Sequence, residues 1–206
     1  KSGQVLDRPE WCDIAGAFID RLIAYGHPDG YFEEHTNDER EGGPSLVYTP
    51  LTAGCSYIVQ RWRNAVDHAR FAKCGTLFRQ FLDTHHHAMP FADERANPHS
   101  IGSYGIALHS LTPQGRTLLT EHFEALDFES LSLEGLARLD LELDHMETGE
   151  GTVPEPYTEG TFRITPPLGV ARSHNWTMGL SAMKALNREI SPNGDYALDR
   201  QTLLFL

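Results

Sequence analysis

The chain has 206 residues, of which 40% are hydrophobic and 22% charged, a composition typical of a globular protein rather than a disordered one. Its formal charge is −12, from 29 acidic and 17 basic residues, and this argues against binding to nucleic acid, whose phosphates are neutralised by Lys and Arg. An acidic small ligand is still compatible with that charge, because the local field inside a cleft can oppose the net charge. No apolar run reaches the length of a membrane-spanning helix, so we expect no membrane partner.

The first half of the chain predicts three helices. The first is expected over 9–25, because Pro9 suits a first helical turn and Gly26 suits a helix stop. The next two are expected over 51–63 and 65–84, and their short link predicts that they pack as an antiparallel hairpin. The apolar stripe of the first helix consists of Trp11, Ile14, Phe18, Leu22 and Tyr25.

The second half of the chain predicts three further helices before residue 147. A short helix is expected over 106–110, and the next begins with Thr112 as N-cap and Pro113 at the first helical position. Ser132 caps the following helix, and the apolar side chains expected to face inward from it are Leu133, Leu136, Leu139, Leu143 and Met146.

The rest of the C-terminal part is expected to be a loop, a helix and a β segment. Residues 147–173 are rich in Pro and Gly and predict a loop, and residues 175–188 predict a final helix. Long loops inside a compact domain are usually functional or disordered. The long loops of this chain retain Tyr, Phe and Trp, which disordered linkers usually lack, and this favours function.

The loop over 27–50 combines aromatic and polar groups. Asp29 lies in a turn, and Tyr31, Glu33 and His35 follow it in an alternating aromatic and polar run. Tyr48 directly precedes the next helix. Tyrosine stacks on sugar rings and also donates or accepts protons, which favours a sugar-binding cleft. In the alternative interpretation, the aromatic residues simply fill the ends of the helix pair.

The loop over 85–105 contains a run of three histidines and, further on, His99 and Tyr104. Consecutive histidines do not face one metal from a helix, where ligands need i, i+3 or i+4 spacing, so the run is interpreted as a solvated helix end. We therefore expect no metal and no cofactor, with a metal site on this run as the weaker alternative. His99 is either held over a cleft by a tight turn or is a surface histidine.

The segment Ala-Arg-Ser-His-Asn-Trp-Thr gathers several chemical functions. Arg172 and Asn175 are side chains that bind or neutralise a carboxylate. His174 is suited to act as a base near neutral pH, and Trp176 is suited to stack on a pyranose ring. The alternative is that His174 or Asn175 only caps the predicted final helix. Since capping requires neither Arg nor Trp, the functional interpretation is favoured.

The loops "HPDGYFEEH…GGPSLVYTP", "NPHSIGSYG" and "RSHNW", set between helices, resemble those of α/α-toroid proteins that act on acidic polysaccharides, the heparinase II/III-like lyases and related uronate-processing enzymes. The ending "DYALDRQTLLFL" resembles the junction with their C-terminal β-sandwich. The resemblance implies an all-α fold, with an incomplete α/α toroid of antiparallel helix pairs over 1–194 and the start of a β segment over 195–206. Because the toroids of the family are longer, it also implies a fragment whose missing partner is the remainder of its own chain.

The resemblance implies β-elimination next to a uronic acid in an acidic oligo- or polysaccharide. Tyr48 and either His99 or His174 would then transfer protons, and Arg172 and Asn175 would neutralise the carboxylate of the substrate. Two alternatives are a toroid glycoside hydrolase that uses Asp29 or Glu33 and a non-catalytic sugar-binding helical module. The residues expected to bind the substrate are Asp29, Tyr31, Glu33, His35, Tyr104 and Trp176.

Overall fold

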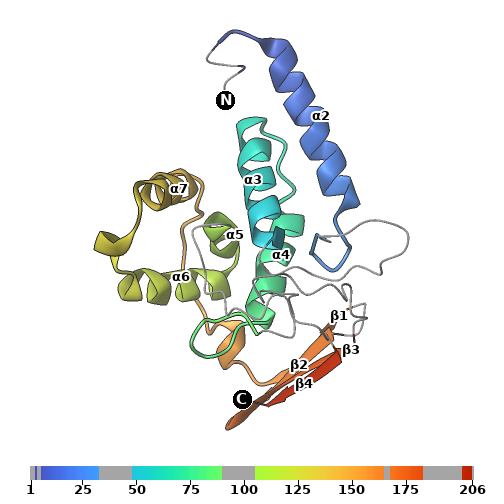
Figure 1. Cartoon of the computed structure of the whole chain (residues 1–206), viewed down its shortest axis with the longest axis vertical. Coiled ribbons are helices and arrows are strands. Elements are labelled where there is room, and N and C mark those ends of the chain that lie inside the picture. The colour runs from blue at the N-terminus through green and yellow to red at the C-terminus, as the bar shows by residue number, and fades with distance from the viewer. Residues whose placement is uncertain are drawn as a thin grey trace, which may run out of the picture.

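A computed structural model of the chain describes residue 3 and residues 6–32, 48–89, 105–164, 168–182 and 201–205. This part is mostly helical and ends in a small antiparallel sheet (Figure 1), which is consistent with the predicted all-α fold that passes into β-structure. The α-helices are α2 (Pro9–Tyr25), α3 (Tyr48–Trp62), α4 (His68–Gln80), α5 (Ile106–Ser110), α6 (Pro113–Ala125) and α7 (Leu133–Leu143). The other elements are the 3₁₀ turns η2 (Phe128–Ser130) and η3 (Glu155–Tyr157) and the strands β1 (Gly160–Ile164), β2 (Leu168–Ser173), β3 (Trp176–Ala182) and β4 (Gln201–Phe205).

The predicted helix starts agree with the structure where a capping side chain sets them. The Thr112 hydroxyl accepts a hydrogen bond from the Gly115 N–H at 3.2 Å, and the Ser132 hydroxyl accepts one from Gly135 at 3.1 Å. These bonds satisfy backbone donors that the first helical turn leaves free. The N-caps of α6 and α7 are therefore confirmed.

Helices α3 and α4 form the centre of the helical part. They are joined by residues 63–67 and lie against each other, with Tyr57 of α3 packed edge-on against Phe71 of α4 at a ring distance of 5.4 Å. The short helix α5 packs against both, and its Ala107 and Leu108 are buried. The predicted pairing of these two helices is confirmed, and it places the end of α4 next to the sheet (Figure 1).

The sheet corrects two predictions for the C-terminal part. Its strand order is β1-β2-β3-β4 with antiparallel neighbours, so the loop predicted over 147–173 is wrong from Gly160 onward. The helix predicted over 175–188 is wrong where Trp176–Ala182 form β3. Helix propensity is a weak preference, and here hydrogen bonding of β3 to strands on both sides overrides it. Strand β4 lies within the segment 195–206 that was expected to be β-structure.

One face of the sheet packs on the C-terminal turns of α4. Alternate residues of β2 are buried, and Val170 and Leu168 join a cluster with Leu77 and Phe78 of α4. Phe162 of β1 packs edge-on against Phe81 at 5.7 Å. This contact fixes the sheet to α4, and the candidate functional site lies along the same boundary.

Two helices expose apolar residues that the sequence pattern grouped into stripes. On α2, Ile14 and Phe18 are 68% and 64% exposed, whereas Ile19 and Gly16 are buried against α3. An ion pair joins the same helix to the end of α3, since Arg63 binds Asp20 at 2.7 and 3.0 Å. On α7, the prediction that the leucines face inward is confirmed for Leu139, which is buried. It is wrong for three leucines that are exposed, Leu133, Leu136 and Leu143.

Two isoleucines on α2 provide a matched stability test. Changing the buried Ile19 to Ala is expected to lower the free energy of unfolding by about 2–4 kcal/mol, because it leaves a cavity against α3. The same change at the exposed Ile14 is expected to shift it by less than about 0.5 kcal/mol. Urea unfolding of both variants measures the difference. Equal losses would show that α2 does not pack on α3 through this face.

A buried polar network joins α4, α5, α6 and η3. The Arg79 guanidinium is fully buried, and its Nε and Nη2 donate to the two carboxylate oxygens of Glu155 at 2.7 and 2.8 Å. Nη2 also donates to the Thr112 hydroxyl at 2.7 Å, and Nη1 lies 3.3 Å from Nδ1 of His109. The network fixes η3, and therefore the start of the sheet, on the helical core.

The histidine of this network predicts a pH-dependent stability. Burial, followed by the charge of Arg79, lowers the pKa of His109 well below its ordinary value of 6.5. The unfolded chain binds a proton near that value and the folded chain does not. The stability from neutral His109 is thus fully present above 6.5, and it falls by about 1.4 kcal/mol per pH unit below it, until the folded pKa is reached.

Urea unfolding from about pH 7.5 down to about pH 5 tests this dependence. We expect wild type to lose more free energy of unfolding over this range than His109→Gln, because the variant has no histidine to charge in the unfolded state. The exposed His85 supplies the control, since His85→Gln should keep the wild-type pH profile. Parallel profiles for wild type and His109→Gln would contradict the prediction.

Candidate functional site

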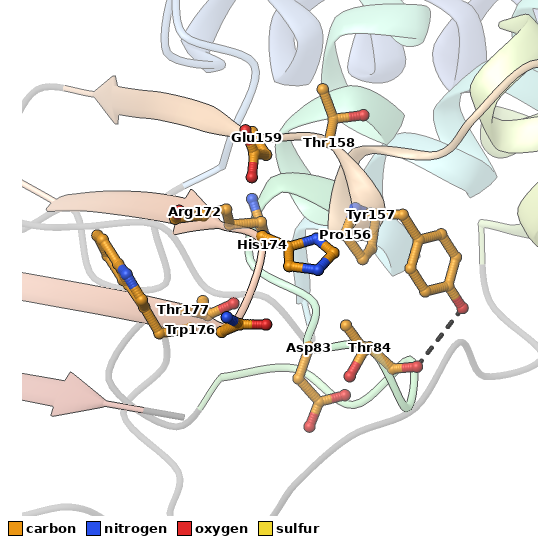
Figure 2. A pocket seen from close by; sticks show the side chains of 12 residues that line it. Asp83, Thr84, Pro156, Tyr157, Thr158, Glu159, Arg172, His174, Trp176 and Thr177 are labelled. Atoms are coloured by element: carbon orange, nitrogen blue, oxygen red, sulfur yellow. Dashed lines mark hydrogen bonds between the residues drawn. The ribbon is translucent and has the colours of Figure 1, made fainter.

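A pocket of about 520 Å³ lies where the β2–β3 hairpin, η3 and the chain after α4 meet (Figure 2). Its size is within the range of small-molecule sites, about 300–1,000 Å³. It combines aromatic rings with an imidazole, an amide and carboxylates. The lining residues that matter most for its chemistry are Asp83, Tyr157, Glu159, His174, Asn175 and Trp176.

The hairpin brings the predicted cluster to the pocket. Strands β2 and β3 pair up to Ser173 and Trp176, which leaves His174 and Asn175 as a two-residue turn with exposed side chains. The alternative in which one of them caps a helix is therefore wrong, because the segment connects two strands. The four side chains that were singled out thus line one pocket, although the scaffold predicted for them was a helix start.

Arg172 is placed beneath the pocket and is already bound by protein atoms. Its Nη2 donates to the backbone carbonyls of Gln80 at 2.6 Å and Leu82 at 2.9 Å. Gln80 is the last residue of α4, where backbone carbonyls lack helical partners. Burial lowers the pKa of Arg172 to about 10, so it is still charged at neutral pH. Nη2 of Arg172, which was expected to bind or neutralise a substrate carboxylate, is thus held by backbone carbonyls at and just after the end of α4.

The histidine run forms a tight loop next to the pocket. Helix α4 ends at Gln80, so the interpretation of the run as a helix end is wrong. The Asp83 carboxylate accepts hydrogen bonds from the backbone N–H groups of His85 at 2.8 Å and His87 at 2.9 Å. His86 between them has a positive φ of 62°, which is uncommon for a residue other than Gly. Asp83 therefore fixes the loop that forms one edge of the pocket.

Tyr157 is a pocket residue that the sequence did not reveal. Its hydroxyl lies 2.9 Å from Nε2 of His86 and 3.3 Å from a carboxylate oxygen of Glu121, and these two groups are 3.1 Å apart. Burial, with the charge of Glu121, raises the pKa of Tyr157. The available signal was an aromatic residue within the Pro- and Gly-rich stretch over 147–173.

Of the remaining predicted site residues, those that the structure describes do not line this pocket. Tyr31 is fully buried, stacks on His27 at 4.3 Å and belongs to the core cluster that contains Leu77 and Phe78 of α4. Asp29 lies in the turn after α2, and Tyr48 begins α3; neither is among the lining residues. The candidates that lie outside the described residues are Glu33, His35, His99 and Tyr104.

The part of the chain that the structure describes gives no sign of a metal centre or of a membrane-spanning helix. The described residues contain no cluster of three or more His, Cys, Asp or Glu side chains arranged to hold a metal ion. Among the helices that the structure describes, none is both long and apolar enough to span a membrane. Comparison of the chain with protein-family models, curated proteins and solved structures found no match. The chemistry of the pocket therefore rests on its own side chains.

Proposed function

We propose that the chain binds and cleaves a polysaccharide, and that it acts as a lyase on uronate-containing glycans. The observation that carries the proposal is the composition of one pocket, in which the half-exposed rings of Tyr157 and Trp176 accompany His174 and Asn175. Aromatic rings pack against the apolar faces of sugars, while their polar edges tolerate water. An imidazole transfers protons near neutral pH, which elimination requires.

In the proposed reaction, His174 accepts the proton from C5 of the uronate. The electron pair of that C–H bond forms the C4–C5 double bond, the C4–O bond breaks, and the leaving oxygen takes a proton from the imidazolium. The Asn175 amide donates to the carboxylate of the substrate, whose negative charge grows as the proton leaves. Arg172 contributes its positive charge from beneath the pocket instead of a direct clamp.

We infer that α2 to α7 belong to an arc of an α/α toroid and that β1 to β4 begin a β-sandwich. The exposed apolar residues of α2 and α7 support the arc, because large uncovered apolar faces are unusual on a monomeric protein and mark contact surfaces. In a toroid, neighbouring helices would cover them. The boundary between the two parts would then lie before Gly160 rather than near residue 195.

A second candidate is glycoside hydrolysis, because two carboxylates, Asp83 and Glu159, line the same pocket. Hydrolases use a carboxylic pair about 5–5.5 Å apart for retention or about 6.5–9.5 Å apart for inversion. Asp83 is the weaker partner of the two, since one of its oxygens already accepts two backbone hydrogen bonds. Elimination by His174 is therefore favoured over hydrolysis.

Product analysis on acidic polysaccharides, with a neutral glucan as comparison, tests the proposal. A lyase releases a product whose conjugated double bond absorbs ultraviolet light, whereas a hydrolase releases new reducing ends without that absorption. Binding without either product would indicate the non-catalytic sugar-binding module. If no polysaccharide binds and no product forms, the chain is not a carbohydrate-active protein.

A further inference from the structure

Two aromatic rings frame the pocket from different elements. Trp176 begins β3 and is 46% exposed, and Tyr157 ends η3 and is 45% exposed. Figure 2 shows the Trp176 indole and the Tyr157 phenol at opposite ends of the group of lining side chains, with the His174 imidazole between them. Half-exposed aromatic rings at two ends of one pocket provide two separate faces for ligand rings.

The hydroxyl of Tyr157 is engaged by protein groups, which makes it a poor candidate for proton transfer to or from a ligand. Both His86 and Glu121 lie within 3.3 Å of the phenolic oxygen. The hydroxyl also donates to the Thr84 carbonyl at 3.5 Å, a hydrogen bond drawn as the dashed line in Figure 2. The nearby carboxylate disfavours the phenolate that a base would need. These contacts leave the ring as the part of Tyr157 that a ligand meets.

The backbone of Tyr157 is fixed as firmly as its hydroxyl. Glu155, two residues earlier in η3, forms the buried double hydrogen bond with Arg79 of α4. The Thr158 hydroxyl, one residue later, donates to the Pro154 carbonyl at 3.0 Å. A ring that is already immobile loses little conformational entropy when a ligand packs on it, which favours binding.

The lining side chains offer little positive charge that an acidic ligand could bind. Arg172 is the only Lys or Arg among the described lining residues, and its Nη2 is bound to the end of α4. Glu159 and Asp83 add negative charge. Ring stacking and hydrogen bonds to hydroxyl groups are then the main attractive interactions, and these are screened by salt far less than an exposed ion pair is.

We propose that Tyr157 and Trp176 are stacking platforms for two neighbouring rings of an oligosaccharide, which makes a disaccharide unit the smallest ligand that fills the pocket. His86 and Glu121 are positioning residues that hold the phenol ring in place. This inference rests on the proposed function for its ligand class. It adds the number of sugar rings that the pocket binds and the residues that stack on them. It also assigns Tyr157 to binding and leaves proton transfer to His174.

Titration of the full chain with uronate oligosaccharides of one, two and four rings, followed by calorimetry, tests the inference. We expect the two-ring ligand to bind at least about tenfold more tightly than the one-ring ligand, with no more than about a threefold further gain at four rings. Tyr157→Ala and Trp176→Ala should each weaken two-ring binding about tenfold or more. Raising the salt concentration tenfold should change the dissociation constant by less than about twofold.

Conservative variants separate a platform from a proton carrier. Tyr157→Phe keeps the ring and should weaken binding less than about threefold, with turnover reduced by a similarly small factor. His86→Asn removes the imidazole and keeps a residue type that tolerates positive φ. Its effects on binding and turnover should be as small as those of Tyr157→Phe. Tyr25 on α2 is exposed and does not line the pocket, so Tyr25→Ala is the matched control and should bind as wild type does.

The outcomes distinguish this inference from the proposed function. If wild type binds the oligosaccharides and Tyr157→Ala binds them equally well, the stacking role of Tyr157 is disproved. The proposal that the chain binds sugars would still hold. A loss of turnover of about a hundredfold in Tyr157→Phe, with binding unchanged, would make Tyr157 a proton carrier and overturn the inference. If wild type binds none of these ligands, both the inference and the proposed function fail.

Discussion

Replacing Arg79 by Met is expected to lower the free energy of unfolding by about 3–5 kcal/mol. The change leaves the Glu155 carboxylate largely buried without its guanidinium partner, and an unpaired buried charge is costly. It also removes the hydrogen bond to Thr112, the N-cap residue of α6. Denaturant unfolding near neutral pH measures the loss.

Two further variants show whether burial of the ion pair causes the loss of stability expected for Arg79→Met. Arg63 and Asp20 form an ion pair of similar geometry at the surface, with side chains 37% and 50% exposed. Arg63→Met should therefore cost no more than about 1 kcal/mol. Combining Arg79→Met with Glu155→Leu removes both charges and should recover much of the loss. Similar losses for the Arg79 and Arg63 variants would contradict the buried ion pair.

The same ion pair explains what the sequence could not predict about the pocket. Arg79 and Glu155 are 76 residues apart, and His86 and Tyr157 are 71 residues apart. No local pattern signals such contacts. Tyr157 is fixed by the pairing of Glu155 with Arg79 of α4 and by the contacts of its hydroxyl with His86 and Glu121, so its position depends on tertiary structure. By contrast, the caps at Thr112 and Ser132 act within one helical turn, and local sequence was sufficient to predict them.

The segment around residue 174 shows both the strength and the limit of sequence patterns. Its Arg, His, Asn and Trp were interpreted as a functional cluster from their chemistry alone, and the structure places all four at one pocket. Their scaffold was predicted as a helix because "MGLSAMKAL" favours helix locally. Pairing of Trp176–Ala182 with a strand on each side reverses that preference, and such pairing cannot be read from one segment.

The face that α2 buries was also beyond the sequence pattern. Apolar residues cover a wide arc of this helix, with Ile19 at one side and Phe18 at the other. Periodicity indicates that a helix has an apolar side, but it does not choose between two adjacent apolar strips. The face that α2 buries is the one that meets α3, an element about 25 residues further along the chain, and local sequence carries no signal of that contact.

Replacing His174 by Ala is expected to lower turnover on a uronate polysaccharide by about a hundredfold or more. His174 is the one proposed base of the elimination, and loss of an acid–base group has an effect of this size. Because His174 lies exposed in the turn between β2 and β3, the free energy of unfolding should change by less than about 0.5 kcal/mol. The Michaelis constant should change little, since Trp176 and Tyr157 still bind the sugar.

Two companion variants make the His174 result specific. His85 is an exposed histidine of the neighbouring loop that does not line the pocket, so His85→Ala should keep wild-type turnover. Asn175→Ala should raise the Michaelis constant and also lower turnover, because the amide is proposed to meet the carboxylate both before and during proton removal. The measurement is the initial rate of ultraviolet absorption by the unsaturated product. Turnover within a few-fold of wild type in His174→Ala would remove the proposed base, and the pocket would then retain only its sugar-binding role.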